Sequence, residues 1–170
     1  NVAKLLLAYG ITTSGMTRDE QLVILKAARL TGEKLAGIIG GTPQSAYQAA
    51  MGPVAITISD TPVIDPATGE PIEGNCLTIG GAITCNDAPN VENAIHEFGH
   101  VFDNYYKSKA GDDGHLASDY IPPGDRISTG YKCDQIPCLQ NPWLKYGDPG
   151  NHQEELADMF LNWVLDANPN

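Results

Sequence analysis

Residues 94–103 read AIHEFGHVFD and contain the pattern H-E-x-x-H. On a helix, side chains four residues apart lie on one face, so His96 and His100 would present two imidazoles to a single point. A tetrahedral zinc ion requires such a convergence of ligands. Glu97 would lie beside the metal rather than on it, where a general base can take a proton from a metal-activated water.

The flanking residues predict that this motif lies on a helix. Asn90 can cap the helix, and the sequence from Val91 onward is compatible with it. The predicted apolar stripe consists of Ile95, Gly99, Phe102 and Tyr106, and the neighbouring polar stripe of His96, His100 and Asp103. Gly99 is unfavourable inside a helix, and the close approach of another backbone would explain it. The alternative is an ordinary amphipathic helix that carries two histidines.

The composition predicts one globular domain that spans residues 1–170. Hydrophobic residues make up 42% of the chain, yet no apolar run is long enough to cross a membrane. The net charge of −11 argues against binding to nucleic acid or to anionic membranes. The first residue is Asn rather than Met, so we expect a processed chain whose signal peptide is out of view. We expect the domain to be a monomer.

The chain has four cysteines, at Cys76, Cys85, Cys133 and Cys138. They allow a four-thiolate zinc site, two disulfides or free thiols, but the C-x-x-C spacing of a zinc ribbon is absent. Residues 76–85, CLTIGGAITC, predict a hairpin with a two-residue Gly-Gly turn. In that register Cys76 faces Cys85 closely enough for a disulfide, and Cys133 would then pair with Cys138. Disulfides would indicate an oxidising compartment.

The upstream sequence predicts a helical scaffold and one strand. The predicted elements are a helix over 18–39, a shorter helix over 43–51 and a strand over 54–58. Thr17 and Glu20 form a capping box for the first helix, and Thr42-Pro43 begins the second. Residues 1–15 predict either a short helix or a strand.

Two further segments predict loops. Residues 60–75 are rich in Pro, Gly and acidic side chains. A calcium loop is conceivable there, but the EF-hand spacing is missing, which favours a solvated loop. Residues 107–153 are mostly irregular, and we expect them to form the lower wall of a cleft and the approach to the metal.

The last segment, residues 151–163, reads NHQEELADMFLNW and predicts a helix. Its predicted apolar face consists of Leu156, Met159, Phe160 and Trp163. Glu154 and Asp158 are four residues apart and share another face. One carboxylate could then bind zinc while the other accepts the second N–H of a ligand imidazole, a bond that orients the ring.

The His96-Glu97-x-x-His100 motif followed by Glu154-x-x-x-Asp158 resembles the gluzincins, the zincin metallopeptidases whose third zinc ligand is a glutamate. The stretch HEFGHVFDNYY is particularly similar to the catalytic domain of anthrax lethal factor and its relatives, which include the secreted Pro-Pro endopeptidases. The resemblance implies an α+β, zincin-like fold. It would have N-terminal helices, a small mixed sheet with a β-hairpin, an active-site helix and a C-terminal glutamate-bearing helix.

The resemblance also implies roles for individual residues. Zinc would be bound by His96, His100 and Glu154, while Glu97 activates the water and Asp158 supports a ligand histidine. The family places an oxyanion-stabilising tyrosine before the glutamate ligand. Tyr146 is the best match for it, with Tyr131 second, and packing is the alternative role of either. Glu155 competes with Glu154 as the ligand, but only Glu154 has the Glu-x-x-x-Asp spacing.

Three other polar residues are candidates for lesser roles. His152 could line the site or bind zinc, but its position near a helix cap favours a bystander. His115 lies in a polar loop and could contact transition-state oxygen. Asp103 faces the same side as the two histidines, and we interpret it as helix or loop support because a third ligand from the same helix makes a poor tetrahedron.

The functional hypothesis is a secreted, zinc-dependent endopeptidase acting on a protein or peptide substrate. An extended substrate would pair with the edge strand near residues 76–85. The alternative is a non-catalytic zinc-binding or protein-interaction module derived from the same fold. A structural zinc site, with His152 as a fourth protein ligand, is a further possibility.

Overall fold

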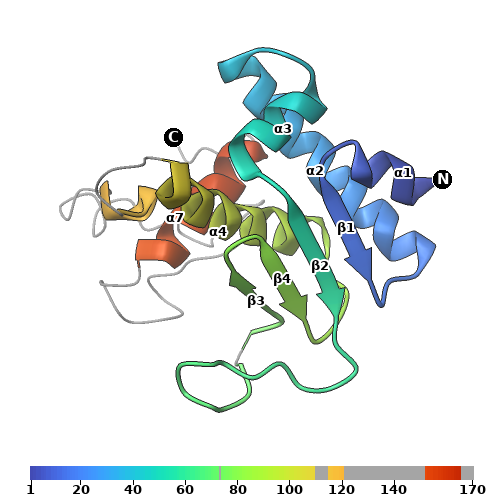
Figure 1. Cartoon of the computed structure of the whole chain (residues 1–170), viewed down its shortest axis with the longest axis vertical. Helices are drawn as coiled ribbons and strands as arrows, with labels where there is room; N and C mark the ends of the chain where they lie inside the picture. Colours follow the sequence, from blue (N-terminus) through green and yellow to red (C-terminus); the bar gives the residue numbers. More distant parts are fainter. Residues whose placement is uncertain (73, 110–114, 121–151, 166–170) are drawn as a thin grey trace, which may run out of the picture.

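The structure is a computed structural model that describes residues 1–72, 74–109, 115–120 and 152–165. Its helices are α1 (Val2–Leu7), α2 (Arg18–Ile39), α3 (Pro43–Met51), α4 (Val91–Lys109), the 3-10 helix η1 (Ala117–Tyr120) and α7 (His152–Val164). Its strands are β1 (Ile11–Ser14), β2 (Val54–Ile58), β3 (Cys76–Ile79) and β4 (Ala82–Cys85). Figure 1 shows α2 and α4 packed on one side of the sheet, with α7 beside α4. The fold is therefore α+β, as predicted.

The sheet is small and mixed, with the strand order β1-β2-β4-β3. Strands β1, β2 and β4 are parallel neighbours, and β3 pairs with β4 in an antiparallel hairpin. The predicted hairpin register is confirmed, because Cys76 pairs with Cys85 and the two form a disulfide with Cα atoms 4.0 Å apart. Closing so short a loop stabilises the fold by about 3 kcal/mol in the chain-entropy account. The disulfide thus ties β3, which has one strand neighbour among the described residues, to the rest of the sheet.

The two N-terminal scaffold helices begin at the predicted caps. Thr17 and Glu20 form a reciprocal capping box, in which the backbone N–H of Thr17 donates to Oε2 of Glu20 at 2.6 Å. Thr42 caps α3 and Pro43 is its first residue. These predictions are confirmed, because each cap depends on contacts within a few residues. The predicted strand over 54–58 is confirmed as well.

The first 15 residues form both a helix and a strand, where the sequence left the choice open. Helix α1 leaves Leu5 and Leu7 more than half exposed, so it lacks the regular apolar stripe of a longer helix. Strand β1 pairs in parallel with β2, from which the whole of α2 and α3 separates it in the chain. A parallel partner so distant in sequence leaves no local signature.

Helices α4 and α7 cross at a point where a glycine is required. A Cβ added to Gly99 would lie 2.6 Å from the Cα of Ala157 in α7. The predicted reason for Gly99, the close approach of another backbone, is therefore confirmed. The crossing brings the α4 face that carries the histidines against α7.

The predicted apolar stripes on these two helices were partly wrong. Tyr106 of α4 is 38% exposed, and the buried residues of that helix all precede it in the chain. Met159 of α7 is 41% exposed, and Leu156 and Trp163 are half-buried. The buried apolar residues of α7 are Ala157, Phe160, Leu161 and Val164. The helix is rotated relative to the predicted face because its smallest side chain has to meet Gly99.

Candidate metal centre

Two histidines of α4 converge across one helical turn. Nε2 of His96 lies 3.1 Å from Nε2 of His100. The helix is positioned by its predicted cap, because Oδ1 of Asn90 accepts a hydrogen bond from the backbone N–H of Asn93 at 2.8 Å. His96 is only 5% exposed, so its ring is held within the packed part of the helix.

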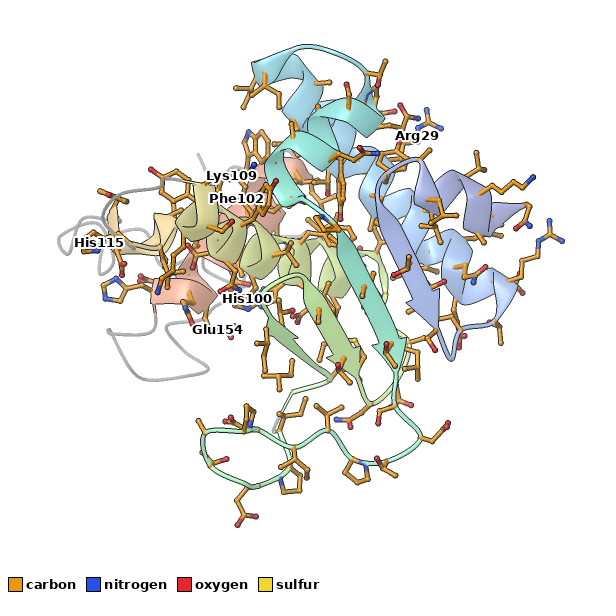
Figure 2. All side chains as sticks on the ribbon, in the orientation of Figure 1. Arg29, His100, Phe102, Lys109, His115 and Glu154 are labelled. Carbon is orange, nitrogen blue, oxygen red and sulfur yellow. A yellow bond between two sulfur atoms is a disulfide. The ribbon has the colours of Figure 1, made fainter. Side chains whose placement is uncertain are left out.

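Glu154 brings a carboxylate from α7 to the two imidazoles. Its Oε2 lies 3.2 Å from Nε2 of His96, and its Oε1 lies 3.3 Å from Nε2 of His100. Figure 2 labels His100 and Glu154, which lie close together at the centre of the molecule. The three residues each offer a ligand atom within 4.8 Å of the others, and they could hold a metal ion. Glu155, the competing ligand, is buried and lies outside this group.

Asp158 fixes the orientation of the first histidine. Nδ1 of His96 lies 2.7 Å from Oδ1 of Asp158, which is 1% exposed. When Nδ1–H donates to this carboxylate, Nε2 is the atom that faces the metal position. Burial lowers the pKa of His96, but hydrogen bonds to Asp158 and Glu154 outweigh it and raise the pKa to about 10. A proton and a metal ion therefore compete for Nε2.

The two histidines determine the ionisation of Glu154. Burial alone would raise its pKa, whereas hydrogen bonds from His100 and His96 lower the pKa below its usual range. The carboxylate is therefore ionised at neutral pH, which is the form that binds a metal ion.

Glu97 lies beside the ligand group, and its carboxylate contacts a residue outside that group. Its Oε2 accepts a hydrogen bond from Oγ1 of Thr78 on β3 at 2.6 Å. A cavity opens at this place between the segment 74–78, α4 and the start of α7. Both histidines, Glu97 and Glu154 line it. The candidate base and the candidate metal ligands thus share one cavity, bordered by the edge strand.

Thr78 and Asn93 are cavity residues that sequence reasoning missed. A signal for Thr78 existed in the hairpin register, which pairs it with Ile83, a buried core residue. Cross-strand partners share a face of the sheet, so Thr78 had to face the helices. Asn93 lies one turn before Glu97, on the face of α4 that carries the motif.

The other polar candidates are not members of the metal group. Asp103 is buried and accepts hydrogen bonds from the backbone N–H and the hydroxyl of Ser118, at 2.8 and 2.7 Å. It anchors η1, which agrees with its interpretation as loop support. His115 is exposed and lies 3.3 Å from Oδ2 of Asp119, well away from His100 in Figure 2. His152 begins α7 and is not a member of the ligand group.

Several predicted residues lie outside the part of the chain that the structure describes. They are Tyr131, Cys133, Cys138 and Tyr146. Residues 60–72, 74 and 75 are described, and none of them belongs to a group that could hold a metal ion.

Similarity to known proteins does not identify the chain, since no protein-family model, no curated protein and no solved structure matches it. Within the described residues, no helix is long and apolar enough to cross a membrane. The function must therefore be inferred from the chemistry of the side chains that the fold brings together.

Proposed function

We propose that this chain is a secreted, zinc-dependent endopeptidase with a zincin-like fold. The observation that carries the proposal is the convergence of His96, His100 and Glu154 around one point, with Glu97 beside them in the same cavity. Two imidazoles and one carboxylate are the ligand set of several catalytic zinc sites, which keep a fourth position for water or substrate.

The ligand spacing fits zinc. Ligand atoms about 2.0–2.1 Å from a tetrahedral zinc ion lie about 3.3 Å from one another. The two Nε2 atoms are 3.1 Å apart. Oε2 of Glu154 lies 3.2 Å from Nε2 of His96, and Oε1 lies 3.3 Å from Nε2 of His100. The nitrogen-rich donor set favours zinc over calcium or magnesium, which prefer all-oxygen sites. The support that Asp158 provides to His96 is the outer-shell bond expected at such a centre.

The zinc ion and the protein would each supply a part of peptide hydrolysis. When bound, zinc would supply Lewis-acid activation of a water and of the scissile carbonyl. Glu97 would take the proton from the attacking water and return it to the departing amine. The resemblance to gluzincins assigns the oxyanion contact to Tyr146, with Tyr131 as the second candidate; both lie outside the described residues.

The cavity suggests how a protein or peptide substrate would bind. Strand β3 forms one wall, and it is an edge strand in the described sheet. An extended peptide could add to this edge through backbone hydrogen bonds, which would lay its scissile bond beside Glu97 and the metal ligands. The Cys76–Cys85 disulfide is compatible with an extracellular location, where such bonds persist.

Asp158→Asn should weaken zinc binding by about 10- to 100-fold, the usual cost of losing an outer-shell partner. The reason is that a neutral amide accepts more weakly from Nδ1–H of His96. Competition with a chromogenic chelator would measure the change. The matched control is Asp119→Asn, an exposed residue that pairs with His115 and does not contact the zinc ligands. Unchanged affinity in Asp158→Asn would contradict the assigned role.

The proposal as a whole is tested by metal content and peptide cleavage. We expect one tightly bound zinc ion per chain, and cleavage of a diverse peptide library that a chelator abolishes and added zinc restores. A chain that binds zinc but cleaves no peptide would instead support the non-catalytic module. A closed structural site would need a fourth protein ligand, and no described residue joins the group of three.

A further inference from the structure

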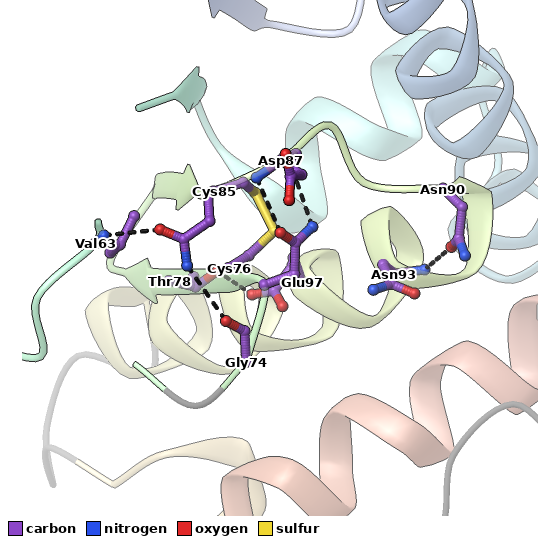
Figure 3. The surroundings of a disulfide bond; sticks show 11 residues. Val63, Gly74, Cys76, Thr78, Cys85, Asp87, Asn90, Asn93 and Glu97 are labelled. Atoms are coloured by element: carbon purple, nitrogen blue, oxygen red, sulfur yellow. Dashed lines mark hydrogen bonds between the residues drawn. A yellow bond between two sulfur atoms is a disulfide. The ribbon is translucent and has the colours of Figure 1, made fainter. Parts of the chain in front are cut away.

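The bond between Thr78 and Glu97 joins two elements that pack against each other, β3 and α4. Oγ1 of Thr78 lies 2.6 Å from Oε2 of Glu97, a length typical of a hydroxyl that donates to an ionised carboxylate. Figure 3 shows both residues next to the disulfide. Thr78 belongs to β3, the edge strand, and Glu97 belongs to α4, the helix that carries the histidines.

The register of the hairpin turns the side chain of Thr78 toward the helices. Thr78 pairs with Ile83, which is 2% exposed and belongs to the core. Both side chains therefore project from the face of the sheet that packs on the helices. Cys76, two residues earlier on β3, is covalently held to Cys85. A one-residue slip would turn Thr78 to the opposite face, and the disulfide prevents it.

The contact also distinguishes the two oxygens of the Glu97 carboxylate. Oε2 accepts the hydroxyl of Thr78, whereas Oε1 accepts no hydrogen bond from any residue that the structure describes. Glu97 is 8% exposed and lines the cavity together with His96 and His100. Fixing one oxygen restricts rotation of the carboxylate, so the other is held in one orientation within the cavity.

We propose that Thr78 is a positioning residue, which orients the Glu97 carboxylate so that Oε1 receives the proton of the attacking water. The proposal rests on the proposed endopeptidase function and adds to it a residue outside the H-E-x-x-H motif. Thr78 also belongs to the strand on which an extended peptide would pair, so one residue connects substrate docking with the orientation of the base. A carboxylate free to rotate would spend much of its time out of reach of the water.

Thr78→Val removes the hydroxyl but retains the β-branched shape that suits a strand. We expect kcat to fall about 10- to 100-fold, the range for loss of a hydrogen bond to a charged group, and KM to change less than about twofold. Thr78→Ser keeps the donor and should restore most of kcat. The matched control is Thr84→Val on β4, which makes the same change at a position paired with Leu77, on the opposite face of the sheet.

A second readout requires neither zinc nor activity. In the metal-free protein, Thr78→Val should shift the midpoint of urea unfolding more in the wild-type background than in a Glu97→Ala background, because only the former loses the bond. Equal shifts of the unfolding midpoint in the two backgrounds would show that Thr78 and Glu97 do not interact, and would overturn the proposal. Zinc affinity should be unchanged by Thr78→Val, which separates this residue from Asp158.

Failure of this inference can be distinguished from failure of the proposed function. A wild-type chain that binds zinc and cleaves no peptide overturns the endopeptidase assignment, and the positioning role falls with it. An active wild-type chain in which Thr78→Val retains full kcat overturns the positioning role alone. A rise in KM with kcat retained, or an equal loss in Thr84→Val, would also overturn it, because either result indicates a general disturbance of the sheet.

Discussion

Glu97→Gln protein is expected to bind one zinc ion per chain and to lose peptide hydrolysis by about 100- to 10,000-fold, the usual contribution of a general base. Glutamine has the same shape, and its carbonyl oxygen can still accept from Thr78, so the fold and the metal ligands should be unchanged. What it lacks is a group that takes a proton. Steady-state kinetics on a cleaved peptide, together with zinc content by atomic absorption, would measure both effects.

The control for this experiment is Glu92→Gln. Glu92 lies in the first turn of α4 and is half-buried, so the change removes the same charge from the same helix without touching the cavity lining. We expect it to retain full activity. Full turnover by Glu97→Gln would contradict the role of Glu97, and an equal loss in both variants would point to the charge of the helix instead.

Glu154→Gln should release the metal. An amide oxygen is a much weaker zinc ligand than a carboxylate, so we expect zinc affinity to fall by more than the roughly 100-fold that an outer-shell change can cost. Hydrolysis should fall in parallel at limiting zinc. Titration against a chelator of known affinity would measure the loss, and circular dichroism would verify that α7 remains helical.

Glu155→Gln is the decisive companion variant, because the two residues are adjacent and chemically identical. Glu155 is 4% exposed and is not part of the ligand group, so its variant should keep zinc affinity within about threefold of the wild type, a change below 1 kcal/mol. Release of zinc from Glu155→Gln, with retention in Glu154→Gln, would reverse the ligand assignment and with it the orientation of α7.

Much of the fold could be predicted because the relevant signals are local. The capping box of Thr17 and Glu20, the Thr42-Pro43 helix start and the Gly-Gly hairpin turn each involve residues close in the chain. The turn alone places Cys76 opposite Cys85. The spacing of His96 and His100 likewise predicts a shared helix face before any tertiary contact is known.

The errors arose where a decision depended on distant parts of the chain. The choice between helix and strand over residues 1–15 stays open in the sequence, because the parallel partner of β1, β2, lies beyond two intervening helices. The hydrophobicity of Met159 predicts that it lies on the buried face of α7, yet it is 41% exposed. The sequence does not predict the bond between Thr78 and Glu97, because no local pattern connects β3 with α4.

The amino-acid sequence by itself determined the longer helices, the hairpin and the two-histidine motif, since these depend on chain geometry over a turn or a few residues. The tertiary structure decided which acidic side chain completes the site. Glu154 and Glu155 differ by about 100° around the axis of α7. The close contact between Gly99 and Ala157 sets the rotation of that axis, and it turns Glu154 toward His96 and His100.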